Sequence, residues 1–267
     1  MKKTVLKLFA EAVVERPESA MRSRVLGAAL RRIDGVPVRS RYGVVMRTRS
    51  HDLTNYYCIS GENHVDYDDV FSVVSTIRPG MAFFDIGANA GLFSMVAGKR
   101  LGPDGVIVAF EPSPRTFHDL VANAVANGLA NFHPFCAALG LENGVARFDS
   151  GNEGHSGAAH FDGQGKMFVT QMRFADMWPS LRELIGDRKI MVKIDVEGAE
   201  DIVLTSIADL LASGQIETCI VEVDQGYLER FGSSAAALYA KLEAVGLKPR
   251  LGLGTRPHYN EVFERQG

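Results

Sequence analysis

From residue 81 onward, short apolar runs alternate with longer segments in which apolar residues recur every three or four positions. The short runs predict buried parallel strands, and the helical spacing predicts helices that cover them. This alternation favours an α/β fold, a doubly wound and mostly parallel sheet with helices on both faces. The predicted strands are 81–86, 106–111, 132–139, 190–195 and 216–223, and the predicted helices are 91–100, 114–127, 199–212 and 234–245.

The alternation is interrupted in the middle of the chain, where two short strands, 145–149 and 166–172, are predicted around the glycine-rich loop 151–165. Such a loop is long enough to be a substrate lid, although a simple hairpin tip fits it equally well. Near the end of the chain, 248–253 and 258–265 are predicted to be strands joined by a loop. An antiparallel hairpin that closes the sheet is compatible with that pattern.

The first 80 residues follow a different pattern, and we expect them to form an N-terminal extension that contacts substrate or a second subunit. Residues 81–267 are expected to form the main, cofactor-binding domain. The elements predicted in the extension are helices 4–16, 19–33 and 66–77 and a strand-like region 38–60 with a turn at Tyr42-Gly43.

The composition is that of a globular protein, with 46% hydrophobic and 23% charged residues in a chain of 267. No apolar run approaches the roughly 20 residues that span a bilayer. Lys7 and Glu11 interrupt the apolar start of the chain, so no signal peptide is expected. Three widely spaced cysteines favour reduced thiols, and hence a cytoplasmic location, over a disulfide framework.

The net charge of -3 conceals an asymmetry, because residues 1–52 hold 12 basic and 5 acidic side chains. This basic segment is either a solvated helix face or a surface that meets an anionic substrate, a membrane surface or an acidic partner. Aromatic residues do not interleave with its arginines, so no nucleic-acid partner is expected. The N-terminal helices could also pair two subunits, which leaves a homo-oligomer open.

The run from Phe83 to Phe93 joins a predicted strand to a predicted helix through Asp85, Gly87 and Gly91. A strand that turns tightly into a helix over glycines is typical of a nucleoside site. The pattern lacks the second close glycine of a dinucleotide site, and an acid beside the turn would repel pyrophosphate. The acid suits a cationic amino group instead, which favours S-adenosylmethionine over NAD.

Glu111 ends the second predicted strand, 20 residues beyond Gly91. A carboxylate at that position and spacing can accept both hydroxyls of a ribose. The alternative is an acid that merely complements the positive N-terminus of helix 114–127. Because the spacing agrees with the glycine turn, we assign Glu111 to ribose binding.

With these motifs, the chain resembles the FkbM-type family of class I S-adenosylmethionine-dependent O-methyltransferases. The resemblance implies a Rossmann-like, seven-stranded sheet with a reversed last strand. It also implies that Asp85, Gly87, Asn89 and Gly91 hold the methionine part of the cofactor, and that Ala137 and Ala138 lie on the adenine side. The matching segments are Phe84–Gly91, Ala109–Pro112, Ala137–Gly140 and Val192–Glu200.

Methyl transfer to an alcohol oxygen requires removal of the hydroxyl proton, so a general base is expected. Period-two alternation sends Lys193, Asp195 and Glu197 to one side of the last matching segment. We expect Asp195 and Glu197 to act as base, hydroxyl acceptor or metal ligand, whereas Glu200 is expected to complement a helix N-terminus. His155, in the glycine-rich loop, is an alternative base.

No compact ligand motif demands a metal ion, and none is predicted. Asp195 with Glu222 or Asp224 nevertheless leaves a magnesium site open, because these acids follow neighbouring strands. The seven histidines do not recur at zinc-ligand spacing.

The predicted function is S-adenosylmethionine-dependent O-methylation of a hydroxyl on a carbohydrate or natural-product intermediate, such as a polyketide or glycan. Oxygen is chosen over nitrogen or carbon by the family resemblance. One alternative is an NAD(P)-dependent oxidoreductase, which the missing glycine disfavours. A second alternative, a non-catalytic nucleotide-binding domain, is disfavoured because acids gather at one sheet edge.

Overall fold

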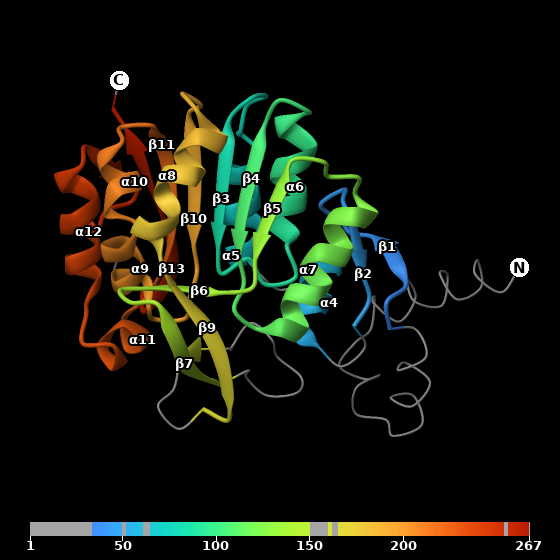
Figure 1. Cartoon of the computed structure of the whole chain (residues 1–267), viewed down its shortest axis with the longest axis horizontal. Helices are drawn as coiled ribbons and strands as arrows, with labels where there is room; N and C mark the ends of the chain where they lie inside the picture. Colours follow the sequence, from blue (N-terminus) through green and yellow to red (C-terminus); the bar gives the residue numbers. More distant parts are fainter. Residues whose placement is uncertain are drawn as a thin grey trace, which may run out of the picture.

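The computed structural model describes residues 34–49, 52–60, 65–149, 160–161, 165–253 and 256–266. Its centre is a seven-stranded sheet in which the strand order is β12-β13-β11-β10-β3-β4-β5 (Figure 1). The strands are β12 (Leu247–Pro249), β13 (His258–Arg265), β11 (Ile216–Asp224), β10 (Ile190–Ile194), β3 (Ala82–Ile86), β4 (Val106–Phe110) and β5 (Phe132–Phe135).

Strand β13 runs against both of its neighbours, whereas β11, β10, β3, β4 and β5 are parallel to one another. Both terminal strands were predicted, and the seven-stranded sheet with a reversed strand is confirmed. Strands β3, β4 and β10 are buried at every position, as expected for parallel strands covered on both faces.

Two apolar cores lie on the two faces of this sheet, which confirms the doubly wound arrangement. Successive side chains of β3 point to opposite faces, so Phe83 belongs to one core, and Phe84 and Ile86 belong to the other. The first core includes α4 (Leu53–Ser60), α5 (Val65–Val74), α6 (Leu92–Leu101) and α7 (Pro114–Ala126). The second includes α8 (Phe174–Ile185), α9 (Glu200–Ser206), α10 (Ala208–Ala212), α11 (Gln225–Arg230) and α12 (Ala235–Ala244).

The described part of the N-terminal extension packs into the first core. Strands β1 (Pro37–Arg39) and β2 (Val45–Arg47) form the antiparallel hairpin predicted from the Tyr42-Gly43 turn. Val38 and Met46 of this hairpin are buried beside residues of α6 and α7. The predicted helices 4–16 and 19–33 lie outside the described residues, as does most of the basic segment.

Residues 53–60 form a helix, so the strand-like interpretation of 38–60 is wrong in its second half. Asp52 Oδ1 accepts a hydrogen bond from Thr54 N at 3.0 Å, which caps the first turn of α4. The helix buries Cys58 and Ile59 in the core. Tertiary packing therefore overrides the β-propensity of its aromatic and branched residues.

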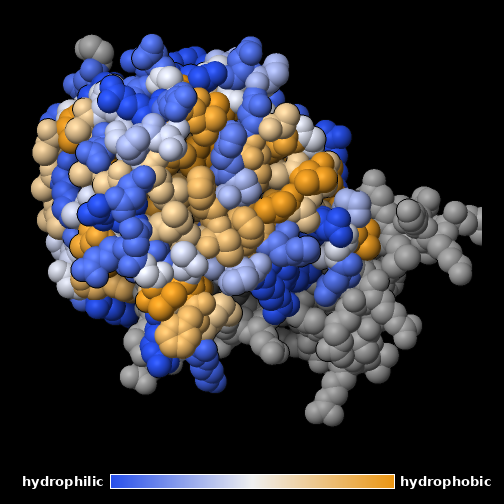
Figure 2. Space-filling view, in the orientation of Figure 1, coloured by the Kyte–Doolittle hydropathy of each residue, from blue (hydrophilic) through white to orange (hydrophobic). Residues whose placement is uncertain are grey.

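The predicted strand 132–139 divides into β5 and β6 (Ala138–Gly140), which belong to different sheets. Strand β6 joins a four-stranded sheet of order β6-β9-β7-β8, whose other members are β7 (Gly144–Asp149), β8 (His160–Phe161) and β9 (Met167–Arg173). Strands β7 and β9 project below the central sheet in Figure 1, and Figure 2 shows apolar surface over this lower region. There Val145 and Phe168 are 73% and 59% exposed.

The predicted helix 199–212 is broken at Ile207, which ends α9 and begins α10. Strand β9 leads directly into α8, where Trp178 stacks on Phe174 at a centroid distance of 5.7 Å. Both rings pack in or against the second core. In the described parts of the chain, no helix is long and apolar enough to span a membrane.

Candidate active site

A cavity of about 280 Å³ opens where β3, β4, β10 and β11 end. The carboxyl ends of parallel strands meet at one edge of the sheet, where α/β proteins bind their ligands. The β3–α6 loop, the end of β4 and the β10–α9 loop form most of its wall. Helices α4 and α5 add Cys58 and Tyr67, so the N-terminal extension also contributes to the cavity.

The β3–α6 loop is held by β4 through its backbone. Gly87 N and Ala88 N both donate to the Phe110 carbonyl, at 3.0 and 2.9 Å. Asn89 N donates to Glu111 Oε2 at 2.9 Å, and Asn89 itself has a left-handed φ of 49°. A non-glycine residue in this conformation is uncommon, and asparagine tolerates it better than most residues. The loop is therefore pre-shaped by the neighbouring strand.

Glu111 lies at the end of β4, faces the cavity and is only 6% exposed. Its Oε1 accepts from Ser113 N at 2.9 Å, while its Oε2 accepts from Asn89 N. Burial raises the pKa of Glu111 to about 7, although both backbone hydrogen bonds oppose that shift. Each carboxylate oxygen has a second lone pair, so the side chain can still accept two hydroxyl groups.

Asp85 is placed differently from what its motif suggested. It is fully buried, accepts from Ser94 Oγ at 2.6 Å, and lies 3.8 Å from Lys193 Nζ. The residues that line the cavity do not include it. Its carboxylate is thus positioned to act through Lys193, and direct contact with a ligand's amino group stays a prediction.

Protein packing and positive φ angles both favour glycine at these two positions of the loop. A Cβ at Gly87 would lie 1.8 Å from the Asp195 carbonyl oxygen, so the β3 and β10 ends could not meet. A Cβ at Gly91 would lie 2.4 Å from Leu120 of α7. Gly87 and Asn89 line the cavity, whereas Gly91 lies behind it at the start of α6.

Ala137 and Ala138 form an apolar wall of the cavity together with Phe110, Leu139 and Phe148. The Phe110 ring is supported from outside by Phe135, with stacked rings 5.0 Å apart. An apolar wall in the same cavity as a buried acid suits a nucleoside, whose base needs a dry surface and whose ribose needs an acceptor.

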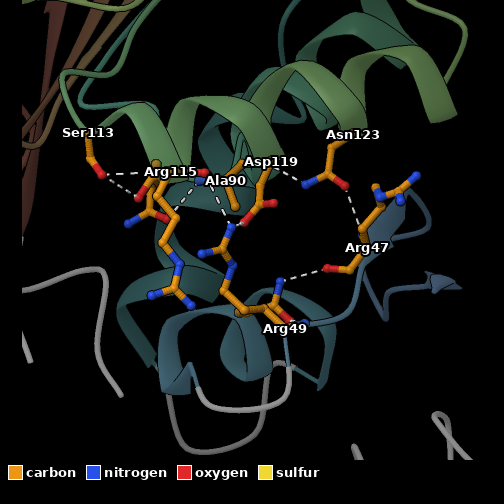
Figure 3. A network of polar contacts seen from close by, with 10 residues as sticks. Arg47, Arg49, Ala90, Ser113, Arg115, Asp119 and Asn123 are labelled. Carbon is orange, nitrogen blue, oxygen red and sulfur yellow. Dashed lines mark hydrogen bonds and ion pairs between the residues drawn. The ribbon is translucent and has the colours of Figure 1, made fainter. Parts of the chain in front are cut away.

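Figure 3 shows a polar network that connects the N-terminal hairpin, α7 and the β3–α6 loop. Asn123, fully buried in α7, donates to the Ala90 carbonyl and accepts from Arg47 N, both at 2.8 Å. Arg49 forms an ion pair with Asp119 one helical turn earlier. The extension is therefore hydrogen-bonded to the helix that supports the loop.

Four charged side chains that line the same cavity gather at the ends of β10 and β11. Lys193 Nζ lies 3.0 Å from Asp195 Oδ2, and it is only 3% exposed. Glu197 and Glu222 join Asp195 in a group whose carboxylate oxygens approach within 4.8 Å of one another. The structure thus brings together the predicted pair Asp195 and Glu197, and adds Glu222 from the next strand.

Crowding and burial shift the proton affinities of this group. Burial raises the pKa of Glu197 to about 9, and the nearby charges of Asp195 and Glu200 act in the same direction. Burial also raises the pKa of Glu222 well above its ordinary value. For Lys193, burial favours the neutral amine, but Asp195 and Asp85 outweigh it and raise its pKa. Lys193 therefore stays charged, whereas the raised pKa values of Glu197 and Glu222 favour the protonated, neutral forms of these two acids.

Glu200 has a mainly structural place in the β10–α9 turn. Its Oε1 accepts from Val196 N at 3.0 Å and from Gly198 N at 3.2 Å. His155, the alternative base, lies outside the described residues.

His258 was not predicted, yet its Nε2 lies 3.5 Å from Glu222 Oε1, because β13 pairs antiparallel with β11. Neither it nor Tyr67 carries a sequence signal, since strand register and helix packing bring them to the site.

The fold and the site define a Rossmann-like α/β protein with a ligand cavity at the carboxyl ends of its parallel strands. The family model described as "Methyltransferase FkbM domain" matches residues 85–249, more than half of the chain, and the chain belongs to that family. S-adenosylmethionine is its cofactor, and the buried, cavity-facing carboxyl of Glu111 and the apolar wall fit the ribose and the base of that molecule.

One curated relative is the 31-O-demethyl-FK506 methyltransferase FkbM of Streptomyces tacrolimicus, with 46% identity over 72 residues. The match covers 27% of this chain and 26% of that relative. Among solved structures, fibrillarin of Aeropyrum pernix with bound S-adenosyl-L-methionine has a TM-score of 0.42 and 14% identity, and the alignment covers 74% of each chain. A putative rRNA methylase of Clostridium thermocellum has a TM-score of 0.45 and 9% identity, over 75% of this chain and 95% of that one.

Proposed function

We propose that the protein transfers a methyl group from S-adenosylmethionine to a hydroxyl oxygen of a carbohydrate or natural-product intermediate, such as a polyketide or glycan. The observation that carries this proposal is the acid pair Asp195 and Glu197, which lines the same cavity as the cofactor loop. The printed name of the Streptomyces relative, a 31-O-demethyl-FK506 methyltransferase, supports oxygen as the acceptor atom.

Cofactor binding is assigned to one half of the cavity. Glu111 accepts the two ribose hydroxyls, Ala137 and Ala138 cover the adenine, and the backbone from Gly87 to Asn89 borders the methionine part. Asp85 and Gly91 support that loop from behind, the first through Lys193 and the second through its contact with α7.

When bound, S-adenosylmethionine supplies a methyl group on a positively charged sulfur, ready for in-line displacement. The chain's own residues have to position and deprotonate the acceptor. The Asp195 carboxylate accepts the hydrogen of the acceptor hydroxyl, Glu197 is a second acceptor once it has lost its own proton, and Lys193 fixes the orientation of Asp195 at 3.0 Å. The acceptor oxygen is thereby made nucleophilic next to the donor methyl group.

Calorimetry with S-adenosylhomocysteine and NADH tests the cofactor half of the proposal. Binding of S-adenosylhomocysteine at micromolar levels, with no NADH binding, is expected. The opposite preference would support the NAD(P)-dependent oxidoreductase, which membership in a methyltransferase family disfavours. Binding without methyl transfer to any of a panel of glycosides and hydroxylated macrolides would favour a non-catalytic nucleotide-binding domain.

The acceptor half is tested with Asp195→Asn and Glu197→Gln. Both variants should bind S-adenosylhomocysteine as the parent does and lose turnover by roughly 100-fold or more, the usual contribution of a general base. Glu217→Gln is the matched control, since Glu217 lies on β11 but pairs with Arg78 outside the cavity. Full turnover in both site variants would remove the assignment of these acids.

A further inference from the structure

The acid cluster of Asp195, Glu197 and Glu222 has more carboxylates than nearby cations. Lys193 contacts Asp195 at 3.0 Å and Asp85 at 3.8 Å, so its single charge is shared between two acids. Glu197 makes no hydrogen bond or ion pair within the described part of the chain. Like charges this close are unfavourable in a buried site unless protons or a cation compensate them.

Glu222 supplies a second, independent observation. It is only 8% exposed, lines the cavity, and its Oε2 has no hydrogen-bond partner among the described residues. Its Oε1 lies 3.5 Å from His258 Nε2, so one oxygen of the carboxylate faces an imidazole nitrogen while the other has no hydrogen-bond partner among the described residues. A buried polar atom without a partner costs about 1–3 kcal/mol, and more when it is charged. Because Glu222 lines the cavity, a ligand bound there could supply the missing partner.

We infer that Asp195, Glu197 and Glu222 bind one divalent cation of the magnesium class. All three donors are carboxylate oxygens, which hard cations such as Mg²⁺ and Mn²⁺ prefer to softer metals. The oxygens can approach one another within 4.8 Å, a separation that one central ion can bridge. Three protein ligands leave about three positions of an octahedral shell open toward the cavity.

The consequence for catalysis rests on the proposed function, whereas the binding of the ion does not. An acceptor with two neighbouring hydroxyl groups could place both oxygens on the open positions. A hydroxyl bound to the cation loses its proton more readily, because the cation stabilises the resulting alkoxide. Asp195 and Glu197 would then act through the ion and not as direct proton acceptors, the hydroxyl proton would pass to solvent water, and a vicinal diol would be the preferred acceptor.

The test is electron paramagnetic resonance of Mn²⁺ titrated into the full-length protein, without cofactor or acceptor. The free-ion signal should fall with one bound ion per chain, and Mg²⁺ should compete. Asp195→Asn and Glu222→Gln should each weaken Mn²⁺ binding roughly tenfold or more, the usual range for altered metal sites. Glu217→Gln, at the other end of β11, should bind as the parent does.

Absence of Mn²⁺ binding by the parent protein, or equal binding by both site variants, would overturn the inference. Asp195 is one-third exposed, so Asp195→Asn decides the question if Glu222→Gln fails to fold by circular dichroism. Binding of S-adenosylhomocysteine is measured on the same samples. If the protein binds Mn²⁺ but transfers no methyl group, only the proposed function is contradicted. If it transfers methyl groups in the presence of EDTA and binds no Mn²⁺, only the inferred cation site is contradicted.

Discussion

The side-chain amide of Asn123 donates a hydrogen bond of 2.8 Å to the backbone carbonyl of Ala90. The same side chain accepts from Arg47 N at 2.8 Å, so one buried residue of α7 joins the cofactor loop to the N-terminal hairpin. The conformation of the loop at Asn89 is uncommon, and such conformations persist only when surrounding contacts determine them.

Asn123→Ala should therefore weaken S-adenosylhomocysteine binding roughly fivefold, about 1 kcal/mol, the usual worth of one hydrogen bond. It should also lower the free energy of unfolding, since buried partners are left unsatisfied. Asn127→Ala is the matched control. Asn127 binds the backbone of Val45 with both side-chain atoms but contacts no residue of the loop. It should lose stability and keep its affinity, as measured by calorimetry and urea unfolding.

Affinity for S-adenosylhomocysteine should depend on the ionisation of Glu111, whose pKa burial raises to about 7. Below that pH the carboxyl is protonated and a weaker acceptor for ribose hydroxyls. The dissociation constant is therefore expected to rise as the pH falls from 8 to 6, by at most about tenfold per pH unit. Glu111→Ala should bind weakly at every pH. Equal affinities of the parent protein at pH 6 and pH 8, by calorimetry, would contradict this role.

The ionisation of Glu111 should affect the stability of the ligand-free protein in the opposite direction to its effect on ligand affinity. A carboxyl whose pKa is raised on folding binds more protons in the folded state, so stability falls as the pH rises from about 4.5 to 7. In Glu111→Ala this contribution is removed. The apparent melting temperature of the ligand-free variant should then respond less to pH in that window than the melting temperature of the parent protein.

Gly87→Ala and Gly80→Ala separate packing from backbone strain, because both glycines have a φ of +77°. A Cβ at Gly80 meets nothing within 4 Å, whereas one at Gly87 would overlap the Asp195 carbonyl. The left-handed conformation alone costs about 1–2 kcal/mol for an alanine. Gly80→Ala should lose that much in chemical denaturation, and Gly87→Ala several times more. Similar losses in the two variants would show that the strand ends can move apart.

Lys193→Met should destabilise the protein by about 3–5 kcal/mol, because it leaves the buried carboxylate of Asp85 without its cation. The double variant Lys193→Met/Asp85→Asn should recover part of that loss, and the difference is read from a double-mutant cycle. Lys241→Met is the control. Its pair with Asp201 is about one-third exposed and should contribute less than about 1 kcal/mol. Additive losses at Lys193 and Asp85 would mean that the two groups do not interact.

The sequence predicted the elements whose signals are local. Alternating apolar runs located the five parallel strands, and the spacing from Gly91 to Glu111 located an acid that lies at the cavity. The strand positions depend on the direction of a few neighbouring residues, which strand geometry determines. Asp195 and Glu197 also lie together as predicted, but not through period-two alternation, because the strand ends at Ile194 and Glu197 has a left-handed φ of 55°.

Other features depend on contacts between distant segments. Tyr67 and Cys58 reach the cavity because α5 and α4 pack on the sheet, and His258 does so through its pairing with Asp224. The change of sheet after Phe135 likewise has no local signal. Propensity was misleading at 53–60, where burial of Cys58 and Ile59 decides in favour of a helix.

The position of the reversed strand has a practical consequence for protein production. Strand β13 lies between β12 and β11 in the sheet, although it comes last in the chain. A truncated gene limited to the family match, residues 85–249, would omit it and would also start inside β3. The long strand β11 would then become an open edge of the sheet, and the core beside it would lack Phe263. Exposed edge strands pair with other chains, so the truncated protein is expected to aggregate. An expression clone should therefore keep both flanks, and a tag belongs beyond residue 266.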